Sequence, residues 1–226
     1  MNKNVPVHLL KRRKVICLGD SITEGAGDQR GIGWPGRLAL KLGEKQPLSY
    51  MVNNLGISGD HSANIYHRLN SEVIQRLPDL LIIGAGTNDM QEVVIRSGVA
   101  HGTTQSLNWS ELCWQKILSA VKTHQIPALV WSLLPVDASK LPLRYDPEEY
   151  GYESYDYVNE RITLYNDMLQ RLCMSHNIPF LDLYSQWQGV NLAELMDDGL
   201  HPNVQGYDLM AEQIYEALQE RKMLVV

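Results

Sequence analysis

Short apolar runs alternate along this chain with segments in which apolar residues recur every three or four positions. Short runs are typical of buried strands, and the three-to-four spacing is typical of helices with one buried face. The expected strands are 15–18, about 49–54, 80–83, 128–131 and 180–183. Strands that alternate with helices predict a mostly parallel sheet with helices on both faces, which is an α/β fold.

The helical pattern is clearest after residue 157, where one face carries Val158, Ile162, Tyr165, Leu169 and Leu172. The other expected inner faces are Trp34, Leu38 and Leu42; Ile65, Leu69, Val73 and Leu77; Trp109, Cys113, Ile117 and Val121; and Tyr207, Met210, Ala211, Ile214 and Leu218. Residues 90–107 have no clean period, so we expect a loop there with a helical turn.

The one long irregular stretch is 134–157, which holds three prolines and five tyrosines. Loops of this length inside compact domains are usually functional. We therefore favour a part of the site here over an ordinary surface excursion packed by its own aromatic rings. Residues 1–13 are expected to be an N-terminal extension, and a chain of 226 residues fits a single domain, 1–226.

The composition excludes several classes of protein. A net charge of −6 argues against a nucleic-acid-binding protein, which would usually show a basic face. The three cysteines have neither metal-site nor disulfide spacing, so we expect packing roles for them and no metal or other cofactor. The N-terminus lacks a signal-peptide pattern and no run is long enough to span a bilayer. The expected localisation is cytoplasmic.

Polar, turn-forming residues recur after the first three strands and again before the last helix. The four clusters are 19–21, 54–59, 84–89 and 197–202. In an open parallel sheet, the loops that lead from strands into helices emerge at the same edge, which is where ligands bind. Ser21 and His201 can therefore meet although 180 positions separate them.

These clusters contain the groups that acyl transfer needs. A serine hydroxyl such as that of Ser21 is a poor nucleophile until a base takes its proton, and His201 can be that base. Asp198 precedes His201 by three positions and can orient its ring. The backbone N–H groups of Ser21 and Gly56 and the side-chain amide of Asn88 can form an oxyanion hole.

Each of these residues also has a structural interpretation. The segment 19–21 is an ordinary strand-to-helix turn, Gly56 and Asn88 suit turns, and His201 suits a surface loop. Singly, each is more often structural than catalytic, but the full set at one edge favours catalysis. We expect further substrate contacts from the pocket walls and from these polar loops: Asp20, Trp34, Asp89 and Tyr145, with His61 and His101 near the pocket.

In these motifs the chain resembles the SGNH (GDSL-type) hydrolase superfamily. Gly19-Asp20-Ser21-Ile22 is similar to the first block, with Ile where the family name has Leu, and Asn54-x-Gly56-x-Ser58-Gly59 to the second. Gly86-Thr87-Asn88-Asp89 and Asp198-x-x-His201 match two further blocks, so the motifs span nearly the whole chain.

The resemblance implies a three-layer α/β/α flavodoxin-like fold with a five-stranded parallel sheet of order 2-1-3-4-5. It implies a Ser21–His201–Asp198 triad, an oxyanion hole of Ser21, Gly56 and Asn88, and metal-free hydrolysis of carboxylic esters or thioesters through an acyl-serine. The absence of a long apolar stretch in the loops favours short acyl chains. The partner implied is a small ester, and the oligomeric state is not readable.

Two other functions stay open. The same triad could deliver the acyl group to a sugar or alcohol, or remove acetyl groups from a carbohydrate. The chain could also be a non-catalytic, flavodoxin-like binding module whose glycine-rich loops hold a phosphate. Against that module, the first turn lacks both a Gly-x-Gly-x-x-Gly motif and a Walker-type lysine, and Asp20 and Glu24 would repel a phosphate.

Overall fold

A computed structural model describes residues 11–89, 102–141 and 156–224, with only the backbone for 102–106 and 156–157. Its centre is a parallel sheet, and the strand order β2-β1-β3-β4-β5 is the expected one. The strands are β1 (Arg13–Gly19), β2 (Tyr50–Gly56), β3 (Leu80–Gly84), β4 (Ala128–Trp131) and β5 (Phe180–Leu181). The central strands are fully buried because their sequences are almost wholly apolar, as both-sided burial requires.

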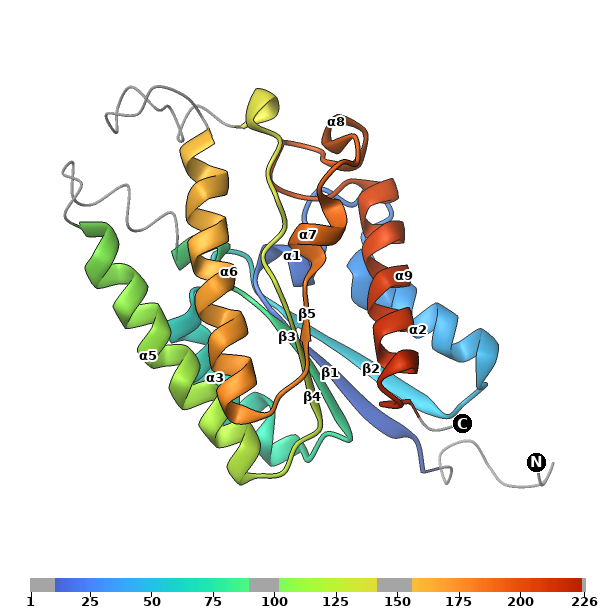
Figure 1. The fold of residues 1–226 in the computed structure, drawn as a ribbon. Coiled ribbons are helices and arrows are strands. Elements are labelled where there is room, and N and C mark those ends of the chain that lie inside the picture. The colour runs from blue at the N-terminus through green and yellow to red at the C-terminus, as the bar shows by residue number, and fades with distance from the viewer. Residues whose placement is uncertain (1–10, 90–101, 142–155, 225–226) are drawn as a thin grey trace.

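Helices cover both faces of the sheet, which confirms the α/β/α layering (Figure 1). One face carries α3 (Ser62–Glu72), α5 (Gly102–Thr123) and α6 (Asp156–His176), and the other carries α2 (Gly33–Lys45), α7 (Leu183–Trp187) and α9 (Val204–Glu220). Short elements complete the described chain: α1 (Ser21–Glu24), η2 (Ile74–Arg76), η3 (Ala138–Lys140) and α8 (Leu192–Leu195). Each face of the sheet thereby has its own hydrophobic core.

The expected inner faces of α2, α6 and α9 are all buried, but two expectations were wrong. Trp109 on α5 is 57% exposed, and Trp114 fills the core in its place. Leu77 also points outward, because α3 ends at Glu72 and Leu77 adopts a left-handed conformation after η2. The irregular stretch expected at 90–107 is already helical from Gly102, and β5 ends at Leu181.

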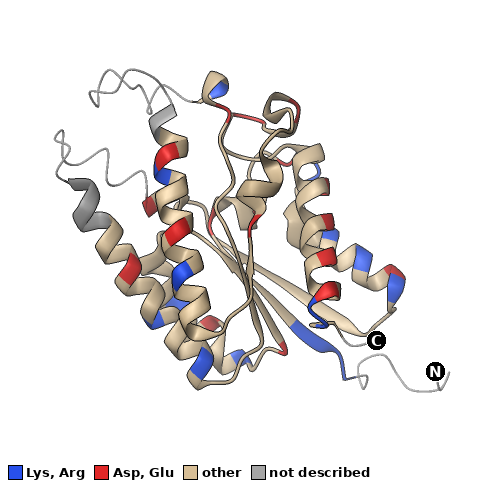
Figure 2. Ribbon diagram, viewed as in Figure 1, with Lys and Arg blue, Asp and Glu red and all other residues tan. Residues whose placement is uncertain are grey.

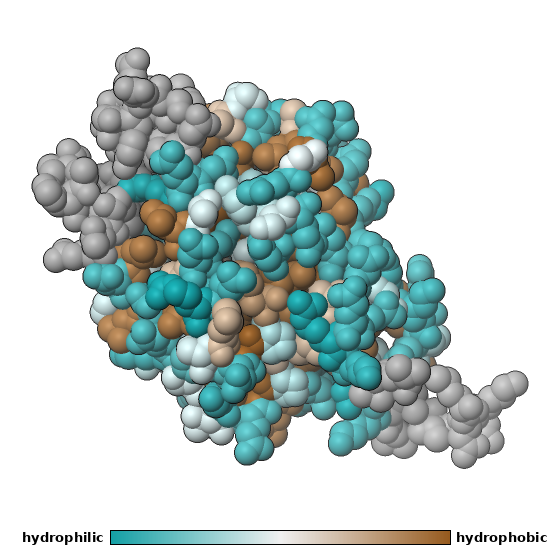
Figure 3. All heavy atoms as spheres, in the orientation of Figure 1, coloured by the Kyte–Doolittle hydropathy of each residue, from teal (hydrophilic) through white to brown (hydrophobic). Residues whose placement is uncertain are grey.

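Charged residues lie mainly on the outer helices and at the ends of the sheet, and the middle of the central strands carries none (Figure 2). On the face seen in Figure 3, hydrophobic residues are scattered among hydrophilic ones. None of the described helices is long and apolar enough to cross a membrane. Cys17, Cys113 and Cys173 are buried free thiols, as their expected packing roles require.

Three glycines mark the carboxyl edge of the sheet. Gly19 at the end of β1 is in register with Gly56 on β2 and with Gly84 on β3. Helix α1 lies directly against this row, since a Cβ added to Gly56 would come within 2.0 Å of the Glu24 backbone nitrogen. The lack of side chains therefore allows the turn after β1 to fold back onto the edge.

Candidate active site

Ser21 is the first residue of α1, directly after β1. Asp20 caps this helix by accepting a hydrogen bond from the Ile22 N–H at 3.1 Å. Ser21 is largely buried, with 8% of the residue exposed. Its Oγ lies 2.9 Å from Nε2 of His201, so the structure brings together two residues that are 180 positions apart.

His201 lies in the loop before α9, and Asp198 holds its ring from the other side. Asp198 Oδ2 is 2.9 Å from His201 Nδ1, and Oδ1 accepts hydrogen bonds from the backbone N–H groups of Leu200 and His201. Partial burial alone would raise the pKa of Asp198. The hydrogen bonds from His201 and Leu200 outweigh burial and keep that pKa well below its ordinary value. Asp198 is therefore a carboxylate at neutral pH.

Asp20 is a second carboxyl group beside the serine, but it is not open to a substrate. Only 1% of it is exposed, and its Oδ2 has no hydrogen-bond partner in the described part of the chain. Burial raises its pKa to about 7, although the Ile22 N–H and the nearby His201 act in the opposite direction. Asp20 thus serves α1 as a cap, and its contact with substrate stays a prediction.

Asn88 lies after β3 and reaches across to the loop that follows β2. Its Nδ2 donates a hydrogen bond to the Asp60 carbonyl at 3.0 Å. A side-chain amide has two N–H donors, so a second one remains available for a reacting oxygen. The backbone N–H of Ser21, at the start of α1, is one of the groups that a helix leaves without an internal partner.

Gly56, the third expected donor, is differently engaged. Its N–H donates to Asn54 Oδ1 at 2.9 Å. In the same loop, Gly59 has φ +85°, and no described residue accepts a hydrogen bond from its N–H. Gly59 also adjoins Asp60, the residue that Asn88 contacts. Sequence reasoning missed Gly59, although it stands in the same motif and a glycine there is the signal of a left-handed turn.

The structure describes only some of the other residues expected near the substrate. Trp34 is fully buried and packs edge-on against Trp131, so it belongs to the core and not to a pocket wall. Asp89 is buried too, and its carboxylate accepts hydrogen bonds from Ser62 and Ser110. Tyr145 and His101 lie outside the described residues. His61 caps α3, where its backbone N–H donates to Asn64.

Metal ligation has no candidate in the described part of the chain, since no group of three or more His, Cys, Asp or Glu residues is placed to hold an ion. The groups at this edge that can take part in chemistry include the side chains of Ser21, His201, Asp198 and Asn88. A hydroxyl next to an imidazole that a carboxylate orients is an arrangement suited to nucleophilic catalysis.

Comparison with known sequences agrees with this chemistry. Residues 17–209 match the model of the GDSL-like Lipase/Acylhydrolase family. The chain belongs to this family. It is 24% identical to an arylesterase of Vibrio mimicus, over 91% of the chain and 88% of the relative. It is 25% identical to thioesterase 1/protease 1/lysophospholipase L1 of Escherichia coli K12, over 91% of the chain and 83% of the relative.

Solved structures of other proteins share the fold. A lipase/acylhydrolase from Enterococcus faecalis superposes with a TM-score of 0.70 at 22% identity, covering 92% of this chain and 96% of that one. An acetyl xylan esterase superposes with a TM-score of 0.71 at 23% identity, covering 91% of this chain and 99% of that one. This chain is accordingly an enzyme of the GDSL-type esterase and acylhydrolase family.

Proposed function

We propose that this enzyme hydrolyses carboxylic esters or thioesters with short acyl groups, through an acyl-serine intermediate on Ser21. The observation that carries the proposal is the continuous contact from Ser21 Oγ through the His201 ring to the Asp198 carboxylate, with 2.9 Å at each step. Both kinds of ester occur in the names of its relatives, one an arylesterase and the other a thioesterase.

In the first half of the reaction, His201 Nε2 removes the Ser21 proton as Oγ attacks the ester carbonyl. Asp198 holds the proton on Nδ1 and stabilises the imidazolium that forms. His201 then gives the proton to the departing alcohol or thiol. In the second half, His201 activates a water molecule that releases the acid and frees Ser21.

The negative charge on the carbonyl oxygen needs donors that are in place before the reaction. We propose the Ser21 N–H, the free N–H of the Asn88 amide and the Gly59 N–H for this role. Gly59 replaces Gly56 in the set because the Gly56 N–H is already bound to Asn54. Each such donor typically contributes about 10²–10³-fold in rate.

The preference for short acyl groups rests on the loop composition, since no long apolar stretch lies in the expected pocket walls. A carbohydrate O-deacetylase or an acyltransferase would use the same residues. The leaving group and the acceptor separate these activities from simple ester hydrolysis. Release of acetate from acetylated sugars, and products formed with competing alcohols, would identify them.

The test is hydrolysis of p-nitrophenyl esters from acetate to palmitate by the parent enzyme and by Ser21→Ala. We expect Ser21→Ala to lower kcat on the order of 10⁶-fold with the thermal transition preserved. The matched control is Ser119→Ala, because Ser119 Oγ also lies near a histidine, 3.2 Å from His176 Nε2. His176 Nδ1 faces Ser175 and the Leu172 carbonyl, so that pair lacks an orienting carboxylate.

Ser119→Ala should therefore keep the parental activity, and the optimum along the ester series should lie at short chains. Turnover by a folded Ser21→Ala protein would exclude the proposed mechanism. Activity that rises toward palmitate would overturn the acyl-chain preference and leave the serine mechanism in place.

A further inference from the structure

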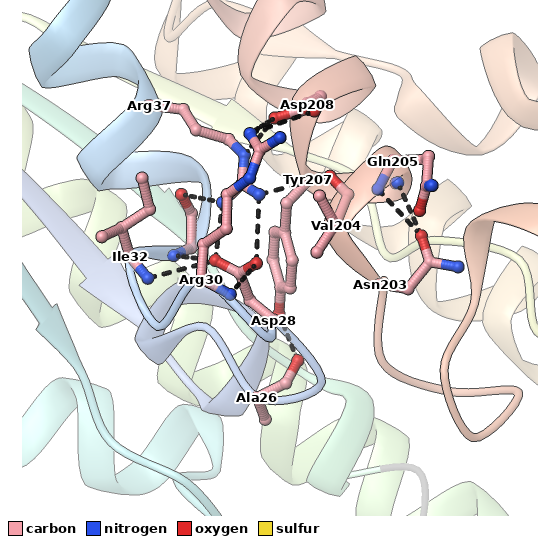
Figure 4. Close-up of polar contacts among 12 residues, drawn as sticks. Ala26, Asp28, Arg30, Ile32, Arg37, Asn203, Val204, Gln205, Tyr207 and Asp208 are labelled. Atoms are coloured by element: carbon pink, nitrogen blue, oxygen red, sulfur yellow. Dashed lines mark hydrogen bonds and ion pairs between the residues drawn. The ribbon is translucent and has the colours of Figure 1, made fainter.

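The segment that follows α1 is built around a buried carboxylate (Figure 4). The side chain of Asp28 is 0% exposed, and it accepts hydrogen bonds from the backbone N–H groups of Arg30, Ile32 and Gly33. Two terminal nitrogens of Arg37, on α2, donate to its two oxygens at 2.6 and 3.0 Å. This is the paired geometry that a guanidinium group offers to a carboxylate.

Arg37 also joins this segment to the start of α9. Its Nε donates to Asp208, and Nη2 donates to the Val204 carbonyl at 3.3 Å (Figure 4). The Gly33 carbonyl accepts the remaining hydrogen bond, from Nη1. The five N–H donors of the guanidinium group are thus all used. A lysine, with one ammonium group, could not satisfy these acceptors together.

The segment held by Arg37 packs directly on His201. A Cβ added to Gly27 would lie 2.7 Å from the Pro202 carbonyl oxygen and 3.1 Å from the His201 Cβ. The Tyr207 hydroxyl, on α9, donates to the Ala26 carbonyl at 2.7 Å. The backbone after the nucleophile helix therefore forms the surface on which the histidine loop rests.

We propose that Arg37 is a positioning residue that sets the contact between Ser21 and His201, an inference that rests on the proposed function. Ser21 and His201 come from segments 180 positions apart, so tertiary contacts alone fix their distance. Arg37 binds to both segments at once, to Asp28 on the serine side and to Val204 and Asp208 on the histidine side.

Stability is a weak reason for this arrangement. Replacing a buried ion pair with well-packed apolar groups is often neutral for stability, because removing two charges from water costs about as much as their attraction returns. Catalysis is more demanding, since a displacement of about 1 Å in a reacting group can cost on the order of 10²-fold in rate. Small movements of the segment would be passed to His201 through Gly27.

The experiment compares Arg37→Lys and Arg37→Met with one control, using p-nitrophenyl acetate as substrate. Gln213→Ala removes a hydrogen bond between α9 and Trp187 on α7, away from the histidine loop. Thermal transitions, kcat, KM and the pH dependence of kcat/KM are measured for each protein.

We expect Arg37→Lys and Arg37→Met to lower kcat by about 10- to 100-fold with KM almost unchanged. The pH dependence of kcat/KM should also differ from that of the parent, because His201 is displaced. Gln213→Ala should keep the parental kcat even if its Tm falls. Gly27→Ala approaches the same contact without changing a charge. Its added Cβ presses on His201, and its φ of +83° disfavours a side chain, so kcat should fall in the same way.

Parental kcat and pH profile in folded Arg37→Lys and Arg37→Met enzymes would overturn the inference. The inference would also be overturned if kcat fell in proportion to the loss in Tm, to the same extent in the Arg37 variants and in Gln213→Ala. Failure of the proposed function appears differently, as an activity of the parent enzyme that Ser21→Ala does not remove. If only the inference about Arg37 is wrong, Ser21→Ala will still be inactive and the Arg37 variants will be fully active.

Discussion

The two sides of the site are held by different sets of interactions. On the acid–base side, charged groups fix His201: Asp198 binds its ring directly, and the Asp28–Arg37 pair holds the segment beneath it. On the proposed oxyanion side, backbone groups and charges together hold the loop that contains Gly59. The Ile57 N–H donates to the Gly19 carbonyl, and the Asp60 carbonyl accepts from Asn88.

Charged groups contact this loop directly as well. The Glu24 carboxylate accepts a hydrogen bond from the Ser58 N–H at 2.7 Å. Arg68 donates to the Asp60 carboxylate at 2.6 Å. The two sides therefore differ at the reacting atoms: a carboxylate contacts the His201 ring, whereas the proposed oxyanion donors are uncharged N–H groups. This difference matches the proposed roles, because a proton-transfer residue needs a tuned charge and an oxyanion hole needs fixed dipoles.

The largest effect should come from the charge on the acid–base side. Asp198→Asn keeps the size of the side chain but cannot hold the same tautomer of His201, so kcat should fall about 10⁴-fold in steady-state assays. The control is Asp197→Asn, one position earlier, where the side chain is exposed and only the backbone contacts His201. Comparable losses of kcat in the two variants would contradict the assignment of the orienting role to Asp198 and not to Asp197.

A smaller loss is expected on the oxyanion side. Asn88→Ala should lower kcat about 10²–10³-fold, with a minor change in KM, because the amide acts on the charge of the transition state. Asn54→Ala tests which glycine supplies the backbone donor. If Gly59 does, freeing the Gly56 N–H should leave kcat unchanged, whereas a rise in kcat would assign the donor to Gly56.

The smallest effect concerns stability against acid. Burial would raise the pKa of Asp28, but the hydrogen bonds from Arg37 and from the backbone keep it well below 3.8, its ordinary value. A carboxyl group whose pKa is lower in the folded state than in the unfolded state stabilises the fold above about pH 4. This stabilisation is lost as the pH falls further. Asp28→Asn should cost about 3 kcal/mol in urea unfolding near neutrality. The difference from the parent should shrink below about pH 4, and a gap that stays constant would contradict this assignment.

Periodicity predicted much of this fold because burial on one face leaves a direct trace in the sequence. The inner face of α9 follows from apolar spacing, and the strand order is what the resemblance carried by the motifs implies. The same reasoning misplaced Trp109, since the neighbouring Trp114 gives α5 an alternative apolar face. It also placed Trp34 in a pocket wall, although its spacing with Leu38 already indicated the core.

The site was predictable as far as residue types carry the chemistry. Ser21, His201 and Asp198 are recognisable from the acid–base properties of their side chains. The direction of a backbone N–H leaves no such trace, so the sequence could not decide between Gly56 and Gly59 as the backbone donor. The Asp28–Arg37 pair was equally hidden, because the segment between the two residues must turn back on itself through Gly31 and Gly33, which have φ of +66° and +55°.

The contact between Ser21 and His201 joins the first strand-to-helix turn of the sheet to the loop before its last helix. Chains are synthesised from the N-terminus, and domains generally fold as units. Ser21 therefore leaves the ribosome long before His201, and Asp28 and Arg37 precede Val204 and Asp208. In the proposed mechanism, a nascent chain that lacks α9 has a serine hydroxyl of ordinary reactivity, so acyl transfer can begin only after α9 has been synthesised.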